Sequence, residues 1–409
     1  MTLSRRSMVQ LAGGAALAAP AIHTASAQAT KTITFGGSVP LSGGAAETGL
    51  NVNNGYKTAV QFINEQGGVE IAGTRYKLDL KLFDDASDPS RAVNLIQRQL
   101  DDGVDFFLGS FGSNIVLPTA AVTERAEKPM VQAGGGSDQI FGQGYKYVFG
   151  MFPRATRQFL STAAFIKTLA PAVKNYSVIF TNDAFSKTAA QGVMNAMKDQ
   201  GIPMLESYSF PETITDASSV LASIRAKTPE ALICMTHDQD NLLIAKQMIA
   251  TGTNVNLLFQ GLGPQLGSFR DTLGKAANGI YFQTYWDERA PLKDRFFGTP
   301  KDFAAYYRKN NTRPIAYHVS AGAACIVTYI EAMMAAKSID PVKVRDALAS
   351  IDVMTQYSRI KFTEQGDGDP VIMGPWVGQV VANAPEVVSP ANAKTAPYTY
   401  PTPAWSQRS

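Results

Sequence analysis

The chain has 409 residues, of which 45% are hydrophobic and 17% charged, and its formal net charge is +3. This length predicts two domains, and the composition is that of a globular chain with large cores. So small a net charge gives no indication of binding to nucleic acid or to an anionic membrane surface.

The first 29 residues have the pattern of an export signal. Arg5 and Arg6 precede an apolar run rich in Ala and Gly, and cleavage is expected after Ala27 or Ala29. The arginine pair favours the twin-arginine route, while the residues that follow it depart from the usual pattern and leave Sec export open. We therefore expect a periplasmic protein that loses residues 1–29, and no other stretch is expected to span a bilayer.

The two cysteines, Cys234 and Cys325, both lie in apolar patterns. Free cysteine is commonly buried, so we expect two buried thiols. A disulfide between them is the alternative that an exported location permits.

Strands and helices alternate in the first part of the chain, which predicts a parallel sheet with right-handed crossovers. Asp88 and Pro89 are expected to start one of the helices, as its N-cap and first residue. An extended run at residues 147–153 has no helix of its own, and the alternation then restarts. The expected strands cover residues 33–39, 76–83, 104–108, 129–133, 176–181, 204–210, 231–235 and 257–260.

A second extended run covers residues 279–286, and three helical segments follow it from about residues 301, 315 and 341. Since few strands accompany these helices, we expect them to pack back on the first domain. Further strands are predicted over residues 357–362 and 371–381.

The chain is therefore expected to cross between its two domains more than once. An N-terminal α/β lobe is predicted from residues 30–149 and 283–366, and a C-terminal α/β lobe from residues 150–282 and 367–384. Residues 385–409 are rich in Pro, Ala and Thr and are expected to form an extended surface tail.

Two loops of small residues follow neighbouring strands of the first domain. A helix start offers free amides and a positive dipole end to an anion, and a serine there adds a hydroxyl donor. Because the carboxyl ends of parallel strands share one crevice, the loops predict a site for a small carboxylate. A plain helix cap and a plain turn are the structural alternatives. The small residues are Gly112, Ser113 and Asn114 in the first loop, and Gly134, Gly135, Gly136 and Ser137 in the second.

Four short motifs occur in a characteristic order, at residues 40–43, 64–69, 84–89 and 109–113. With these motifs behind an export signal, the chain resembles the leucine/isoleucine/valine-binding proteins of bacterial ABC importers, over residues 31–382. The resemblance implies the type I periplasmic binding fold, an α/β fold of two doubly wound parallel-sheet domains joined by several hinge crossovers. It also implies capture of a small carboxylate by hinge closure, a membrane permease as partner, a monomer, and neither cofactor nor catalysis.

The resemblance further implies roles for single residues. Ser113 falls where the family holds the ligand carboxylate, and Ser137 is expected to supply the hydroxyl of the second loop. Phe185 falls where the second domain usually offers a tyrosine, and His237 where another aromatic residue closes over the ligand. Thr48 falls at a first-domain position that is often aromatic.

One departure bears on the ligand. Relatives that bind α-amino acids carry an acid after the strand at 257–260, where this chain has Gly263. A buried ammonium group without a carboxylate is costly, so Asp183 or Asp238 is expected to replace that acid if the ligand is an amino acid or amide. Amino acids or amides, the commonest ligands of the family, remain the expected class, and the alternative is a ligand without the amino group, an aromatic or aliphatic carboxylic acid.

An enzyme and a sensing domain are the two other classes of function to consider. The sequence holds no nucleophile elbow, P-loop or dinucleotide fingerprint, and Ser113 has no assignable base, which disfavours an enzyme. His237 and His318 show no metal-binding spacing. An exported sensing domain for a membrane receptor is the remaining alternative to the binding component of an importer.

Overall fold

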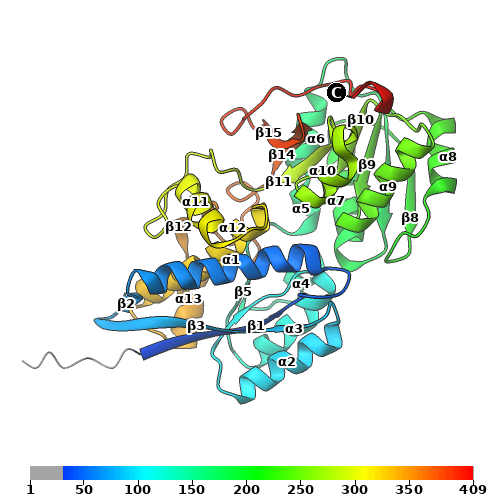
Figure 1. Cartoon of the computed structure of the whole chain (residues 1–409). Coiled ribbons are helices and arrows are strands. Elements are labelled where there is room, and N and C mark those ends of the chain that lie inside the picture. The colour runs from blue at the N-terminus through cyan, green and yellow to red at the C-terminus, as the bar shows by residue number, and fades with distance from the viewer. Residues whose placement is uncertain (1–30, 409) are drawn as a thin grey trace, which may run out of the picture. The chain divides into compact units, whose positions relative to one another are not determined.

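The computed structural model describes residues 31–408. The predicted export signal, residues 1–29, lies outside them. Two sheets organise the described chain, each at the centre of a lobe (Figure 1). The N-terminal lobe surrounds a six-stranded sheet, and the C-terminal lobe surrounds a seven-stranded one.

The sheet of the N-terminal lobe has the strand order β2-β3-β1-β4-β5-β6, and every neighbouring pair is parallel except β2 with β3. Phe35 of the central strand lies opposite Leu80 on one side and Phe106 on the other. The strands are β1 (Lys31–Val39), β2 (Val69–Ile71), β3 (Thr74–Asp84), β4 (Phe106–Leu108), β5 (Met130–Gln132) and β6 (Val148–Gly150).

Helices cover both faces of this sheet. Phe106 and Leu108 belong to the core beneath α1 and α12, while Phe107 belongs to the core beneath α2 and α3, as the period of two along a strand requires. Asp88 caps α2 and Pro89 is its first residue, which confirms that prediction. The late helices pack on this lobe, as predicted. The helices are α1 (Ala46–Glu65), α2 (Pro89–Asp101), α3 (Ser113–Arg125), α4 (Asp138–Phe141), α11 (Pro300–Asn310), α12 (Tyr317–Ala336) and α13 (Pro341–Ala349).

Helix α12 is, by length and composition, apolar enough to cross a membrane. The expectation that no stretch after the export signal has this property was therefore wrong. Of the most apolar window of α12, 78% is buried inside the protein, where it packs along α1. Its apolar character on all sides is that of a core helix.

The sheet of the C-terminal lobe has the order β15-β14-β11-β10-β9-β7-β8, in which β14 and β15 run antiparallel to their neighbours. One face packs on α5, α6 and α7, and the other on α8, α9 and α10. The strands are β7 (Tyr176–Thr181), β8 (Met204–Phe210), β9 (Ala231–Met235), β10 (Leu257–Gln260), β11 (Tyr281–Thr284), β14 (Trp376–Val381) and β15 (Ala384–Ser389). The helices are α5 (Ala155–Gln158), α6 (Leu160–Lys167), α7 (Ala184–Asp199), α8 (Ser218–Lys227), α9 (Asp238–Ala250) and α10 (Gly267–Leu273), followed by a 3-10 turn (Gly274–Ala277).

Three segments join the lobes in the described chain, after β6, after β11 and after the small hairpin of β12 (Asp352–Met354) and β13 (Arg359–Lys361). Two of these segments are tied together, because the Arg154 guanidinium lies 2.8 Å from a carboxylate oxygen of buried Asp367. Burial by itself would raise the pKa of the Asp367 carboxyl. Hydrogen bonds from Arg154 and Thr363 outweigh this effect and lower the pKa.

The prediction of an extended tail from residue 385 was wrong for the first residues of that segment. Residues 384–389 form β15, which returns along β14 after a turn in which Ala382 and Asn383 both have positive φ. Pro385 is tolerated because β15 is an edge strand. Further along, Trp405 donates from Nε1 to the Thr253 carbonyl at 2.6 Å, so the end of the chain is fixed to the C-terminal lobe.

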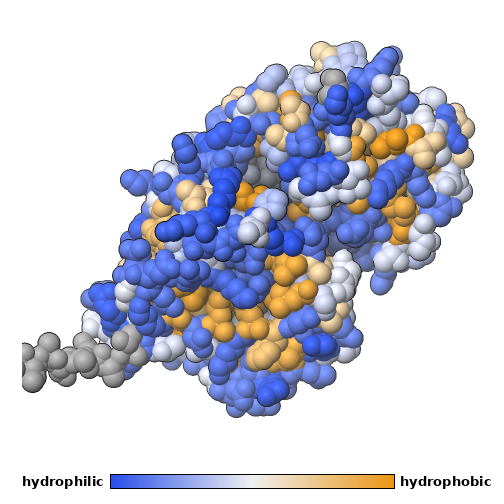
Figure 2. Space-filling view, viewed as in Figure 1, coloured by the Kyte–Doolittle hydropathy of each residue, from blue (hydrophilic) through white to orange (hydrophobic). Residues whose placement is uncertain are grey.

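The prediction for the cysteines holds. Cys234 and Cys325 are free and buried, the first in the C-terminal lobe and the second in the N-terminal lobe. The surface in Figure 2 is mostly hydrophilic, with hydrophobic side chains gathered in patches on the face shown.

Candidate ligand-binding site

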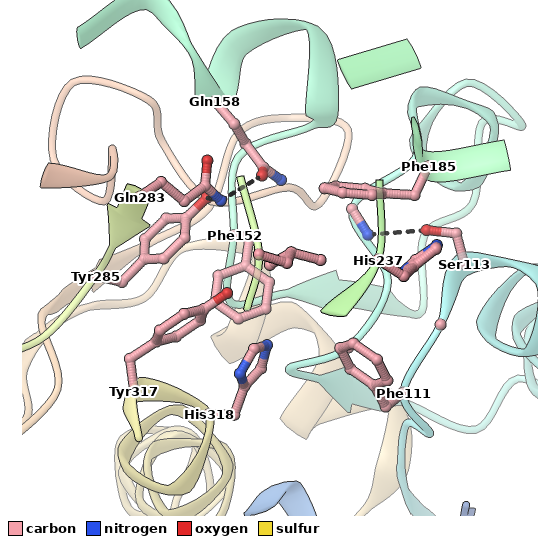
Figure 3. Close-up of a pocket in the computed structure, with 14 residues that line it drawn as sticks. Phe111, Ser113, Phe152, Gln158, Phe185, His237, Gln283, Tyr285, Tyr317 and His318 are labelled. Atoms are coloured by element: carbon pink, nitrogen blue, oxygen red, sulfur yellow. Dashed lines mark hydrogen bonds between the residues drawn. The ribbon is translucent and has the colours of Figure 1, made fainter. Parts of the chain in front are cut away.

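A pocket lies where the carboxyl ends of the two sheets face each other (Figure 3). About 370 Å³ of space lies between its lining atoms, part of it open to solvent. Five aromatic rings and two histidines contribute to its wall, and none of its lining residues is Asp, Glu, Lys or Arg. The lining consists of Phe111, Gly112, Ser113, Gly134, Gly136, Phe152, Gln158, Phe185, His237, Leu262, Gln283, Tyr285, Tyr317 and His318.

Ser113 is the first residue of α3 and joins the two predicted loops. Its Oγ accepts hydrogen bonds from the amides of Gly136, at 3.1 Å, and Ser137, at 3.0 Å. With its oxygen used in this way, the hydroxyl hydrogen has no acceptor among the described residues and is left for a ligand. Gly112 precedes it with φ 102°, a left-handed conformation that favours glycine and turns the strand into the helix.

The first turn of α3 supplies the backbone donors. The amides of Ile115 and Val116 both turn back on the Gly112 carbonyl. This leaves the amides of Ser113 and Asn114 as the unpaired donors at this end of the helix, within the part of the chain that the structure describes. A carboxylate beside Ser113 would meet these groups and the positive end of the helix dipole.

The amides of the second loop are not available to a ligand, contrary to the prediction. Gln132 Oε1 accepts from the amides of Gly134, at 2.9 Å, and Gly135, at 2.6 Å. The next two amides of this loop donate to Ser113. Gly134 and Gly136 line the pocket, but Gly135 does not, since it packs on Val116 and Ile140.

Ser137 is fully buried and does not line the pocket. Its hydroxyl accepts from the Gln139 amide and caps α4. The position of Ser137 therefore does not fit the predicted role as the hydroxyl that the second loop offers to the ligand, because its oxygen already caps a helix.

Two predicted residues reach the pocket from the C-terminal lobe. The rings of Phe185 and His237 lie 6.0 Å apart, centroid to centroid, and Figure 3 shows both on the same side of the pocket as Ser113. His237 Nε2 lies 3.2 Å from Asp183 Oδ1. Burial of the His237 ring lowers its pKa, but the hydrogen bond to Asp183 and its charge outweigh that effect and raise it.

Asp183 forms its hydrogen bonds with residues of its own lobe. Its Oδ1 also accepts from the amides of Phe185 and Ser186, both at 3.0 Å, and its Oδ2 accepts from the Thr181 hydroxyl. Burial alone would raise the pKa of this carboxyl, but the hydrogen bonds from His237 and Ser186 win and lower it. Both oxygens of this carboxylate therefore already accept hydrogen bonds within the C-terminal lobe.

Thr48, Asn114, Asp183 and Asp238 line a second, more acidic pocket that adjoins the first one at Phe111, Gly112 and His237. Across it the Thr48 hydroxyl donates to Asp238 Oδ2 at 2.6 Å. Asp238 Oδ1 is buried without a hydrogen-bond partner among the described residues. Burial raises the pKa of the Asp238 carboxyl.

Gly263 lines neither of these two pockets, whereas its neighbour Leu262 lines the first. Its φ is 106°, and a Cβ atom there would lie 3.0 Å from the Phe269 ring. An acidic side chain at this position would have a strained backbone and would point at Phe269. The family's acid is therefore missing here, as the sequence indicates, but Gly263 itself does not face the ligand.

Sequence reasoning missed most of the wall opposite Ser113. Phe152 lies in the crossover after β6, and Gln283 and Tyr285 lie in β11 and the crossover after it. The two extended runs of the sequence could have indicated these residues, because segments that link two lobes must pass the cleft between them. Tyr317 and His318 begin α12 and gave no signal beyond the start of a helix.

Two α/β lobes that enclose a small pocket at the carboxyl ends of their sheets define a two-lobed ligand-binding protein. The family model described as periplasmic binding protein matches residues 32–385, and the chain belongs to this family. The family is one of binding proteins rather than enzymes.

The relatives differ in what their names say they bind. The Leu/Ile/Val-binding protein homolog 7 of Brucella melitensis is 24% identical, over 83% of this chain and 86% of the relative. LivJ of Streptococcus pneumoniae in complex with isoleucine has a TM-score of 0.76 at 19% identity, over 88% of this chain and all of that one. A solute-binding protein of R. palustris in complex with benzoate has a TM-score of 0.74 at 15% identity, over 90% of this chain and 98% of that one. At such identities these structures establish the fold and leave the ligand to be argued from the pocket.

Proposed function

We propose that this chain is the periplasmic binding component of an ABC importer and that it captures a small carboxylic acid without an ammonium group. After export, the protein binds one ligand as a monomer and delivers it to a membrane permease. The carboxylate lies at Ser113 and the start of α3, and the aromatic walls enclose the body of the ligand.

One observation carries the choice of ligand: none of the residues lining the pocket carries a carboxylate. An ammonium group buried there would lose its hydration without gaining an opposite charge. Asp183, one of the two predicted substitutes, already pairs with His237 and caps α7. A carboxylate by contrast finds charge-assisted hydrogen bonds at Ser113.

Capture proceeds by closure of the lobes. Ser113 belongs to the N-terminal lobe, and Phe185 and His237 belong to the C-terminal lobe, so a ligand that touches all three binds the closed arrangement more tightly than an open one. That difference in affinity is what shifts the population. Small-angle scattering is expected to show a smaller radius of gyration with ligand than without it.

A second candidate, an amino acid or amide, is favoured by Asp238. Its Oδ1 is buried and unpartnered among the described residues, in the pocket that adjoins the first one. A ligand whose amino group extends past His237 would meet this oxygen. An exported sensing domain uses the same binding chemistry, and neighbouring permease and ATPase genes would favour transport over sensing.

Calorimetry with matched ligand pairs tests the proposal. The pairs are phenylalanine with phenylpropionate and leucine with 4-methylpentanoate, and benzoate is added as the smallest aromatic acid. Tighter binding of the deamino acid supports the proposal. If only the amino acids bind, the proposal is wrong, and loss of that binding in Asp238→Asn but not in Asp183→Asn would identify the carboxylate responsible.

A further inference from the structure

The wall of the pocket opposite Ser113 carries uncharged polar groups among aromatic rings. It presents the side chains of Gln158, Gln283, Tyr285 and His318 around the ring of Phe152 (Figure 3). A ligand with a wholly apolar body would leave the His318 ring without a hydrogen-bond partner, which costs free energy.

His318 is the polar group of this wall with the fewest partners. It is the second residue of α12 and only 2% exposed, and its ring extends from the helix into the pocket (Figure 3). Its Nδ1 is buried with no hydrogen-bond partner among the described residues. The other side chains that define its surroundings are aromatic: Tyr317 stacks on it with 4.0 Å between ring centroids, and Phe111 and Phe152 meet it edge-on.

These surroundings fix the state of the imidazole. Burial lowers the pKa of His318 to about 3, so the ring is neutral at physiological pH and carries one hydrogen. A buried N–H without an acceptor is rarer than a buried acceptor without a donor, so the hydrogen belongs on Nε2 rather than on the unpartnered Nδ1. Nε2, the outer nitrogen of the ring, then offers a hydrogen-bond donor to the pocket.

The charge of the wall limits what this donor can bind. The carboxylate of the ligand is already assigned to Ser113 and the start of α3, where backbone amides add to the hydroxyl. A second anionic group beside His318 would be buried among aromatic rings with no cation in the lining. The acceptor that fits a neutral donor at this place is an uncharged oxygen.

We propose that His318 is a specificity-determining residue that donates from Nε2 to an uncharged oxygen on the far end of the ligand, so that the ligand is an oxygenated aromatic acid such as a hydroxybenzoate. This inference rests on the proposed function, since it takes the carboxylate to lie at Ser113. Gln283 favours a hydroxyl as this oxygen, because its Nε2 donates to Gln158 and Tyr285 and its Oε1, an acceptor that needs an O–H, is left buried and unpartnered among the described residues.

Calorimetry with benzoate, 3-hydroxybenzoate and 4-hydroxybenzoate tests this on the mature protein. At least one hydroxybenzoate is expected to bind about tenfold more tightly than benzoate, the effect of one hydrogen bond. His318→Phe keeps the ring and removes both nitrogens, and should bring the ratio close to one. His318→Gln keeps a donor near the position of Nε2 and should restore part of the preference.

Ser320→Ala is the matched control, because Ser320 is buried on the same helix and does not line the pocket. It should leave the ratio unchanged, and circular dichroism checks that each variant is folded. If benzoate and both hydroxybenzoates bind alike, or if His318→Phe leaves the preference intact, the inference is wrong while the proposed function stands. If leucine or phenylalanine binds and none of the three acids does, the proposed function fails and the inference fails with it.

Discussion

The Thr48 hydroxyl donates to Asp238 Oδ2 at 2.6 Å, and this hydrogen bond joins the start of α1 in the N-terminal lobe to the start of α9 in the C-terminal lobe. The two residues are 190 positions apart in the sequence. Both would be exposed to water if the lobes separated as the proposed hinge motion requires, so we expect this bond only in the closed arrangement. It would then stabilise closure from outside the pocket that holds the proposed ligand.

Thr48→Val should weaken ligand binding about fivefold, because the shape is kept and a hydrogen bond of the closed state is lost. Calorimetry measures the affinity, and scattering should show a larger radius of gyration for the unliganded variant. Thr58→Val, on the same buried face of α1 but outside both pockets, is the control and should bind as the wild type does. Equal affinities for the two variants would show that the bond contributes nothing to closure.

Ser113→Ala should weaken binding of a carboxylic acid about tenfold or more, because it removes a charge-assisted hydrogen bond. Since Ser113 also accepts two amides of the second loop, some loss of stability is expected as well. Ser137→Ala separates these effects, because it removes the cap of α4 and leaves the pocket lining unchanged. It should lower the melting temperature with little change in affinity. Wild-type affinity in a folded Ser113→Ala protein contradicts the assignment.

The pair of Asp183 and His237 gives the stability a pH dependence. The pKa of His237 is raised in the folded state, so its contribution is complete below the unfolded value of about 6.5 and is lost as the pH rises through the folded value. The pKa of Asp183 is lowered, so its contribution is complete above the unfolded value of about 3.9 and is lost as the pH falls toward the folded value. The pair therefore stabilises most between about pH 4 and 6.5.

Asp183→Asn keeps a good helix cap and removes the charge, so its free energy of unfolding should fall furthest below that of the wild type in this window. Denaturant unfolding at several pH values from 4 to about 8.5 measures the difference. Asp88→Asn is the control, because Asp88 also caps a helix but has no histidine partner. A difference that grows above pH 7 would contradict the sign worked out for His237.

Export is expected to remove residues 1–29 or slightly fewer. N-terminal sequencing of periplasmic protein should find a start after Ala27 or Ala29, and a start at Met1 would contradict the prediction. Replacing Arg5 and Arg6 by lysine should hold the precursor in the cytoplasm if the twin-arginine route is used. Export that continues in this double variant, and stops when Sec is inhibited, would assign the protein to the Sec route.

Local patterns determined the order of the elements. The alternation of apolar and polar residues in β3, the cap formed by Asp88 with Pro89, and the loop that ends in Ser113 are properties of a few neighbouring residues, and the structure has all three. These features depend on interactions between residues close together in the chain. The crossing between lobes was also predicted from sequence, because few strands accompany the late helices.

Only the tertiary structure decided which groups face the ligand. The loop of Gly134 and Gly135 was predicted to meet the ligand, but the amides of both residues donate to Gln132 Oε1. Asp183 was a predicted partner for an ammonium group, but His237 lies against it. Whether a polar group is free depends on neighbours that are distant in sequence, and a local pattern does not contain them. His318 became a candidate for the same reason: its unpartnered nitrogen is visible only once Phe111, Phe152 and Tyr317 surround its ring.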